Sequence, residues 1–200
     1  MSVKIAMESI KDLRKKTGVG IQDCKEALEK SGGDFEKAVE FLRKKGVLKA
    51  QKRAGRDTEN GFIGSYVHNG QIGVLVELVC ETDFVSRNEK FQVLARELAI
   101  HVAASAPSFV SREDVPAQVL KKEKEIIIEK LGKECKPKEI LDKIAEGQLE
   151  KYYEDFCLLD QPYVRDEKKK IKDLINEVIA AYGEKIEIRR FTRMILGEDD

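Results

Sequence analysis

The sequence has no long apolar run, and its formal net charge is zero. No run approaches the roughly 18 apolar residues that a membrane span needs, so we expect no contact with a membrane. The opening residues, MSVKIAMESIKDL, are neither apolar throughout nor rich in Arg and Ser. We therefore predict no secretory or organellar leader and a cytoplasmic location. Apolar residues form 42% of the 200-residue chain, which indicates a folded core.

Cysteine and histidine are scarce and scattered. The cysteines are Cys24, Cys80, Cys135 and Cys157, and the histidines are His68 and His101. No CxxC pair occurs, which argues against a zinc site, and the lack of a secretion signal argues against a disulfide framework. Cys24 and Cys80 have apolar neighbours and are predicted to be buried. Both histidines are predicted to be structural.

The motifs of the common catalytic sites are also missing. The sequence contains no GxxxxGK[ST], no GxGxxG after a strand, no HExxH and no GxSxG. Acidic pairs such as Glu113 with Asp114 are typical of solvated surface. We predict that the protein is not an enzyme and uses neither a metal nor another cofactor.

Charge is distributed unevenly along the chain. Residues 1–56 carry 15 basic and 8 acidic side chains, whereas residues 57–200 carry 22 and 29. Seven of the basic residues lie in Arg43 to Arg56, RKKGVLKAQKRAGR. This run suits RNA phosphates or an acidic partner, and it equally suits a solvated helix end. No aromatic residue interrupts it, so we expect no specific nucleic-acid partner.

The first 46 residues predict three short helices. Gly18 ends the first helix, Asp34 is a good N-cap for the third, and Gly46 is predicted to end it. Such a small unit has a thin core, so we expect it to pack on a neighbour or a partner.

A strand-rich texture follows. Two β-rich runs, Phe62 to His68 and Gln71 to Glu81, flank Asn69-Gly70, and this dipeptide between such runs predicts a hairpin. Alternate residues of the second strand form one apolar face, from Ile72 to Cys80. Leu75 and Val79 lie on the other face, so the strand is predicted to be covered on both sides.

A tight turn over Thr82–Val85 is predicted to connect this strand to a helix. Ser86 and Glu89 have the spacing of a capping box, so the helix is expected to begin there. Further helices are predicted after Pro116 and Pro137 and over Ile171 to Tyr182. Ile186 and Ile188 alternate in a closing strand.

These patterns predict an α+β fold with an antiparallel sheet packed by helices. The predicted division is a three-helix module over 1–46, a basic linker over 47–60, an α+β core domain over 61–196 and an acidic tail over 197–200.

Several segments resemble bacterial elongation factor Ts, the exchange factor for elongation factor Tu. They are LRKKTGVGI at 13–21, ELVCETDFV at 77–85, LLDQPYV at 158–164 and IEIRRF at 186–191. These matches occur in the family's order and span nearly the whole chain. The resemblance implies a ubiquitin-associated-like fold for the three N-terminal helices.

The resemblance also implies partner docking for the module over 1–46, dimerisation and exchange for the core domain over 61–196, and roles for two shorter segments. Thr82, Asp83, Phe84 and Val85 correspond to the turn that intrudes beside the magnesium site of the partner. Gly18, Val19, Gly20 and Ile21 correspond to a tip that docks on the partner's GTPase domain. The short form of the family forms a homodimer, so a homodimer is expected here.

The residues themselves leave alternatives open. Asp83 also suits a helix start, and Phe84 and Ile21 also suit a core. The alternative function is an RNA- or ribosome-associated protein that binds through residues 43–56. A structural adaptor built on the N-terminal module is a third reading, and it leaves the core unexplained.

Overall fold

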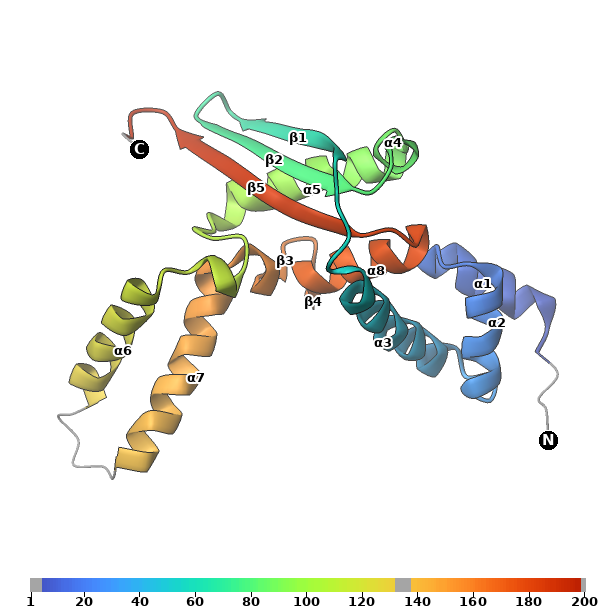
Figure 1. The fold of residues 1–200 in the computed structure, drawn as a ribbon, viewed down its shortest axis with the longest axis horizontal. Coiled ribbons are helices and arrows are strands. Elements are labelled where there is room, and N and C mark those ends of the chain that lie inside the picture. Colours follow the sequence, from blue (N-terminus) through green and yellow to red (C-terminus); the bar gives the residue numbers. More distant parts are fainter. Residues whose placement is uncertain (1–4, 132–137, 199–200) are drawn as a thin grey trace. The chain divides into compact units, whose positions relative to one another are not determined.

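The computed structural model describes residues 5–131 and 138–198 (Figure 1). The helices are α1 (Met7–Thr17), α2 (Ile21–Lys30), α3 (Phe35–Arg53), α4 (Asp83–Ser86), α5 (Glu89–Ser105), α6 (Ala117–Leu131), α7 (Lys138–Phe156) and α8 (Ile171–Tyr182), with short 3-10 turns η1 (Arg112–Asp114) and η2 (Leu158–Asp160). The strands are β1 (Asn60–His68), β2 (Ile72–Cys80), β3 (Pro162–Tyr163), β4 (Asp166–Lys170) and β5 (Ile186–Ile195). Helices packed with an antiparallel sheet confirm the predicted α+β class.

The chain divides into two compact units. The first comprises residues up to Gly64, Glu77–Ala95 and Lys172–Arg189. The second comprises Ser65–Val76, Arg96–Ile171 and residues from Arg190 onward. The strands β1, β2 and β5, in the order β1-β2-β5, run through both units.

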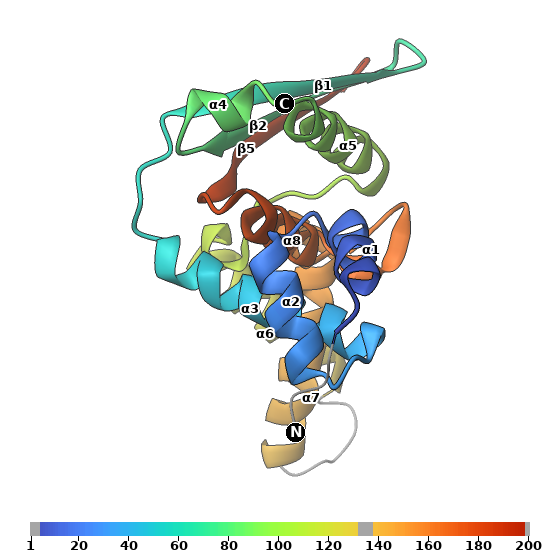
Figure 2. The same ribbon diagram turned by 90° about the vertical axis from the view of Figure 1, so that its right-hand side faces the viewer.

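In the first unit, α8 completes the core of the three N-terminal helices (Figure 2). The buried cluster contains Ile10, Leu13, Val19, Cys24, Ala27, Leu28, Ala38, Leu42 and, from α8, Ala180. As predicted, Gly18 ends α1 with a φ of 70°, and the Asp34 carboxylate accepts the Lys37 N–H at 3.1 Å at the start of α3. The expected reliance on a neighbour is confirmed, because Ala180 lies outside the three helices.

The predicted end of the third helix at Gly46 is wrong. Helix α3 continues for seven residues to Arg53, through the first half of the predicted basic linker. Gly46 is buried within the helix, where an added Cβ would lie 3.2 Å from both the Ala180 Cβ and the Asn176 oxygen of α8. The glycine therefore serves close helix packing and not helix termination. The wider domain division stays a prediction.

The Asn69-Gly70 hairpin forms as predicted, with positive φ values of 50° and 69°. The predicted apolar face of β2 is buried from Val74 to Cys80. On the opposite face Val79 is buried, but Leu75 is 52% exposed, so the prediction that both sides are covered is wrong at Leu75. Helix α5 lies along the sheet, as Figure 1 shows.

In the second unit, α6 and α7 lie side by side and share a small core of Leu120, Ile127, Leu149 and Tyr153. The Arg112 guanidinium binds two carboxylates there. It contacts Asp160 of η2 at 2.8 and 2.9 Å and Glu150 of α7 at 2.7 and 2.8 Å. This one side chain therefore joins η1, η2 and α7.

The predicted helix opening at Pro137 lies outside the described residues, and α7 begins at Lys138. Ile186 and Ile188 are buried in β5, as the closing strand predicts. Two successive exposed residues, Arg189 and Arg190, then interrupt the alternation of burial.

Candidate functional site

The Thr82–Val85 segment leads from β2 into the one-turn helix α4. The expected helix start at a Ser86–Glu89 capping box is wrong, because Ser86 Oγ donates to the Asp83 carbonyl at 3.0 Å. Helix α5 begins at Glu89, and the side chain of Asn88 accepts the Lys90 N–H at 3.0 Å. The predicted turn therefore contains a short helix of its own, α4, which ends at Ser86 before α5 begins at Glu89.

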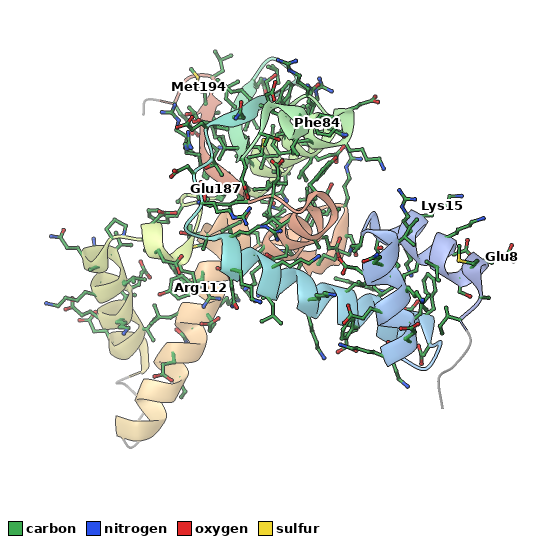
Figure 3. The ribbon with its side chains drawn as sticks, turned by 45° about the vertical axis from the view of Figure 1, so that its right-hand side comes forward. Glu8, Lys15, Phe84, Arg112, Glu187 and Met194 are labelled. Atoms are coloured by element: carbon green, nitrogen blue, oxygen red, sulfur yellow. The ribbon has the colours of Figure 1, made fainter. Side chains whose placement is uncertain are left out.

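Within this turn, exposed and buried side chains are sharply separated. Phe84 is 81% exposed, and Figure 3 labels it on α4. Val85, the next residue, is only 3% exposed and anchors the turn in the core. The alternative that placed Phe84 in the core is therefore wrong. Asp83 is exposed and pairs with Arg87 one turn later, at 3.1 Å.

The base of the turn is held by the connection between α8 and β5. The backbone N–H and the hydroxyl of Thr82 both donate to the Glu184 carboxylate, at 3.1 and 2.7 Å. Glu81 accepts the Lys185 N–H, and that bond, together with the nearby Arg56 guanidinium, lowers the pKa of Glu81. Burial raises the pKa of the neighbouring Cys80 thiol to about 11, so this cysteine is a neutral core residue.

The Gly18–Ile21 segment connects α1 to α2. Val19 is buried, at 4% exposure, and its carbonyl accepts the Cys24 thiol at 3.4 Å. Ile21 begins α2 and is 50% exposed. Of the two apolar side chains of the predicted tip, Val19 is therefore buried and Ile21 is exposed.

An open groove of about 610 Å³ lies beside the start of the Gly18–Ile21 segment, within the first unit. Its lining comes from the end of α1, the start of α5 and one face of α8. Gly18 and Asn88 are both among the lining residues. A second, shallower hollow of about 410 Å³ is lined by Asp83, Phe84, Arg87 and Asn88. Asn88 therefore lines both hollows, of which the larger reaches Gly18 and the smaller reaches Asp83 and Phe84.

The basic run Arg43–Arg56 is largely neutralised by acidic neighbours. Ion pairs join Arg43 to Asp173, Lys44 to Glu40, Lys45 to Asp23 and Glu26, Lys49 to Asp23, and Arg56 to Glu81. Two of these partners, Lys45 and Lys49, hold the pKa of Asp23 below its usual value. Cations already paired with carboxylates have less to gain from phosphates, so the segment is a poor RNA-binding strip.

The remaining reactive side chains have structural surroundings. His101 is fully buried and hydrogen-bonded to Gln161 at 3.0 Å, and His68 bonds the Tyr66 hydroxyl at 2.9 Å. Cys24, Cys80 and Cys157 are buried and free, and Cys135 lies outside the described residues. In the part of the chain that the structure describes, no cluster of three His, Cys, Asp or Glu side chains could hold a metal ion.

Sequence reasoning did not identify Tyr182 or Glu184 as neighbours of the turn. The Tyr182 hydroxyl donates to the Asn88 side chain at 2.8 Å, and the Glu184 carboxylate accepts the Thr82 hydroxyl. These partners lie 94 and 102 residues apart in the chain. No local pattern connects positions so far apart.

Comparison with known proteins gives one consistent answer. The family profile described as "Elongation factor TS" matches residues 35–198. The chain is 57% identical over 197 residues to elongation factor Ts of Thermotoga petrophila, and the match covers 98% of both chains. It is 52% identical over 194 residues to elongation factor Ts of Thermodesulfovibrio yellowstonii, covering 97% of both. Separately, no helix among the described residues is long and apolar enough to cross a membrane.

Proposed function

The chain belongs to the elongation factor Ts family, and we propose that it binds the GDP form of elongation factor Tu and accelerates the release of GDP. Membership assigns it to translation elongation as a nucleotide exchange factor. The proposal adds the partner and the mechanism. Such a factor works where translation takes place, in the cytoplasm.

The observation that carries the mechanism is Phe84, an exposed aromatic ring on a turn whose next residue is buried. Leaving so large an apolar ring in water is unfavourable, so the ring is suited to a partner's apolar cavity. Asp83 brings a carboxylate to the same place. In the partner, a cation bridges the nucleotide phosphates and protein ligands. A wedge and a negative charge inserted beside that cation would disturb its ligands and weaken the hold on GDP.

Exchange of this kind needs no catalytic group. The factor must bind the partner less tightly when nucleotide is present, and linkage then requires nucleotide to bind less tightly when the factor is present. The difference between the two bound states supplies the whole effect. GTP then binds the emptied partner and displaces the factor.

The N-terminal tip supplies affinity in this proposal. Ile21, half exposed at the start of α2, packs on the GTPase domain, and Gly18, Val19 and Gly20 shape the loop that presents it. Because Val19 is buried, its contribution is to the loop's own core.

The proposal also includes a homodimer. In the second unit, four exposed apolar side chains lie on β1, on β2 and on or just after β5: Val67, Leu75, Met194 and Leu196, exposed by 67, 52, 62 and 77%. A second copy of the chain would cover these side chains. Sedimentation of the wild type and of Leu75→Lys with Met194→Lys tests this: a dimer that the double variant converts to monomer supports it, and a monomeric wild type refutes it.

The test of exchange is the release of a fluorescent GDP analogue from elongation factor Tu. We expect strong acceleration by the wild type and at least a 30-fold loss of that acceleration in Phe84→Ala, since a buried aromatic anchor is typically worth 2 kcal/mol or more. Asp83→Ala with Phe84→Ala should lose more. Leu48→Ala is the matched control, because Leu48 is an equally apolar, 59% exposed side chain on α3.

The outcomes separate the alternatives. Acceleration that persists in the double variant would keep the function and refute the role of the turn. No acceleration by the wild type would refute the exchange function. Salt-sensitive RNA binding that is lost when Lys52 and Arg53 are replaced would then favour the alternative reading of residues 43–56.

A further inference from the structure

The segment that carries Phe84 is attached to the end of α8 at two points, both within the first unit. At its start, Thr82 donates its N–H and its hydroxyl to Glu184, two residues beyond α8. At its end, Asn88 accepts the hydroxyl of Tyr182, the last residue of α8. Between these points Phe84 projects into solvent.

The attachment at Glu184 is reciprocal. Glu184 binds the backbone of Thr82, while the carboxylate of Glu81 binds the backbone N–H of Lys185. Two adjacent residues at the end of β2 are thus cross-linked to two adjacent residues before β5. Two opposed hydrogen bonds, each from a backbone N–H to a carboxylate, restrict movement of one segment along the other more than a single bond would.

The short helix has little stability of its own. Helix α4 has four residues, fewer than an isolated helix needs to persist. Its N-cap residue, Thr82, makes no side-chain bond to the helix, and its hydroxyl donates to Glu184. Val85 is the one buried side chain of α4. The direction in which Phe84 points therefore depends on the attachments at either end.

Helix α8 also contacts the N-terminal helices. Ala180 is part of their core, and the nearest neighbour of a Cβ added at Gly18 would be Ala181, at 3.5 Å. The same end of α8 thus supports the loop that presents Ile21 and the segment that presents Phe84.

We propose that Glu184 and Tyr182 are positioning residues for exchange, which hold the 82–88 segment so that Phe84 enters the partner in one orientation. This inference rests on the proposed function. Neither residue needs to touch the partner. Loss of either residue lowers the fraction of molecules in which the turn holds Phe84 in the right orientation, so GDP release within the complex becomes slower. The affinity for the partner is unchanged, because the N-terminal tip supplies it.

The test measures GDP release from elongation factor Tu as the concentration of the factor is raised. For Glu184→Ala we expect the maximal release rate to fall about tenfold, with the half-saturating concentration unchanged within about twofold. Glu184→Gln keeps one acceptor oxygen and should fall about threefold. Tyr182→Phe removes only the hydroxyl and should also fall about threefold. Glu113→Ala, an exposed carboxylate in the second unit, is the control and should match the wild type.

A second set of variants separates positioning from general stability. Thr82→Val keeps the size of the side chain but removes the hydroxyl that donates to Glu184, so it should lose rate. The loss in Thr82→Val with Glu184→Ala should be smaller than the product of the two single losses, because the two residues act through shared hydrogen bonds. Independent, multiplying losses would overturn the coupling.

Hydrogen exchange of the free protein provides a readout without the partner. Glu184→Ala should speed exchange of the Ser86 and Arg87 amides, which bond the Thr82 and Asp83 carbonyls at 3.3 and 3.0 Å. Unchanged exchange, or a wild-type maximal rate in Glu184→Ala, overturns the inference. If the wild type itself gives no acceleration, the proposed function fails, and the amide exchange alone then shows whether the attachment orders the turn.

Discussion

Replacing Arg112 by Ala should destabilise the second unit more than any other single surface change there. The Arg112 side chain, labelled in Figure 3, is 31% exposed and makes four hydrogen bonds to two carboxylates. Its cation also lies 4.6 Å from the centre of the Tyr153 ring. The variant removes all of these contacts at once.

The two carboxylates contribute unequally. The Glu150 side chain is 59% exposed, and an ion pair at such a site is worth about 0–1 kcal/mol. The Asp160 side chain is 5% exposed, and removing one member of a buried pair costs about 3–5 kcal/mol. Because Arg112 itself is partly in solvent, we take the lower end of that range. The expected loss in the free energy of unfolding is therefore about 3 kcal/mol.

Urea unfolding followed by circular dichroism measures this difference. Arg112→Lys keeps the charge but not the forked geometry and should lose about half as much. Glu150→Gln should lose less than about 1 kcal/mol. If Arg112→Ala costs no more than Glu150→Gln, the argument that the buried Asp160 dominates is wrong.

Two further predictions concern pH and packing. Burial lowers the pKa of His101, against the opposing effect of its bond to Gln161, so the folded protein keeps this ring neutral. As the pH is lowered below about 6.5, the ordinary pKa of histidine, His101 becomes protonated in the unfolded chain but stays neutral in the folded protein. The free energy of unfolding should therefore decrease by up to about 1.4 kcal/mol for each unit by which the pH is lowered, until the pH reaches the pKa of the folded state. Unfolding measured from pH 7.5 to 5 should show this slope in the wild type and in His68→Gln, and a slope that persists in His101→Gln would refute the assignment. Separately, a Cβ at Gly64 would lie 2.2 Å from the Ala95 carbonyl oxygen, so Gly64→Ala should cost about 3 kcal/mol, whereas Gly73→Ala, with open space around it, should be neutral in the same thermal melts.

Much of the fold follows from short-range patterns. Asn69-Gly70 predicts its own hairpin because both residues accept positive φ, which few others do. The buried face of α5 follows from helical spacing alone. Asp34 marks the start of α3 because its carboxylate accepts the N–H of Lys37, only three residues later. The motif around Thr82–Val85 was recognisable by resemblance, although its residues alone left Phe84 as either core or surface.

Two of the errors depended on whether a distant segment packs against the residue. Gly46 looked like a helix end, but α3 continues there because the missing side chain lets α8 approach closely. Leu75 looked buried, but among the described residues nothing covers it enough to prevent 52% exposure.

The sequence by itself determined most of the helices and strands, and by resemblance it singled out the Thr82–Val85 turn, since these depend on residues within a few positions of each other. Only the tertiary structure decided how that turn is held. Thr82 and Glu184 are 102 residues apart, and Arg112 and Asp160 are 48. Hydrogen bonds and ion pairs act over a few ångströms of space, and a linear pattern carries no measure of that distance until the chain has folded.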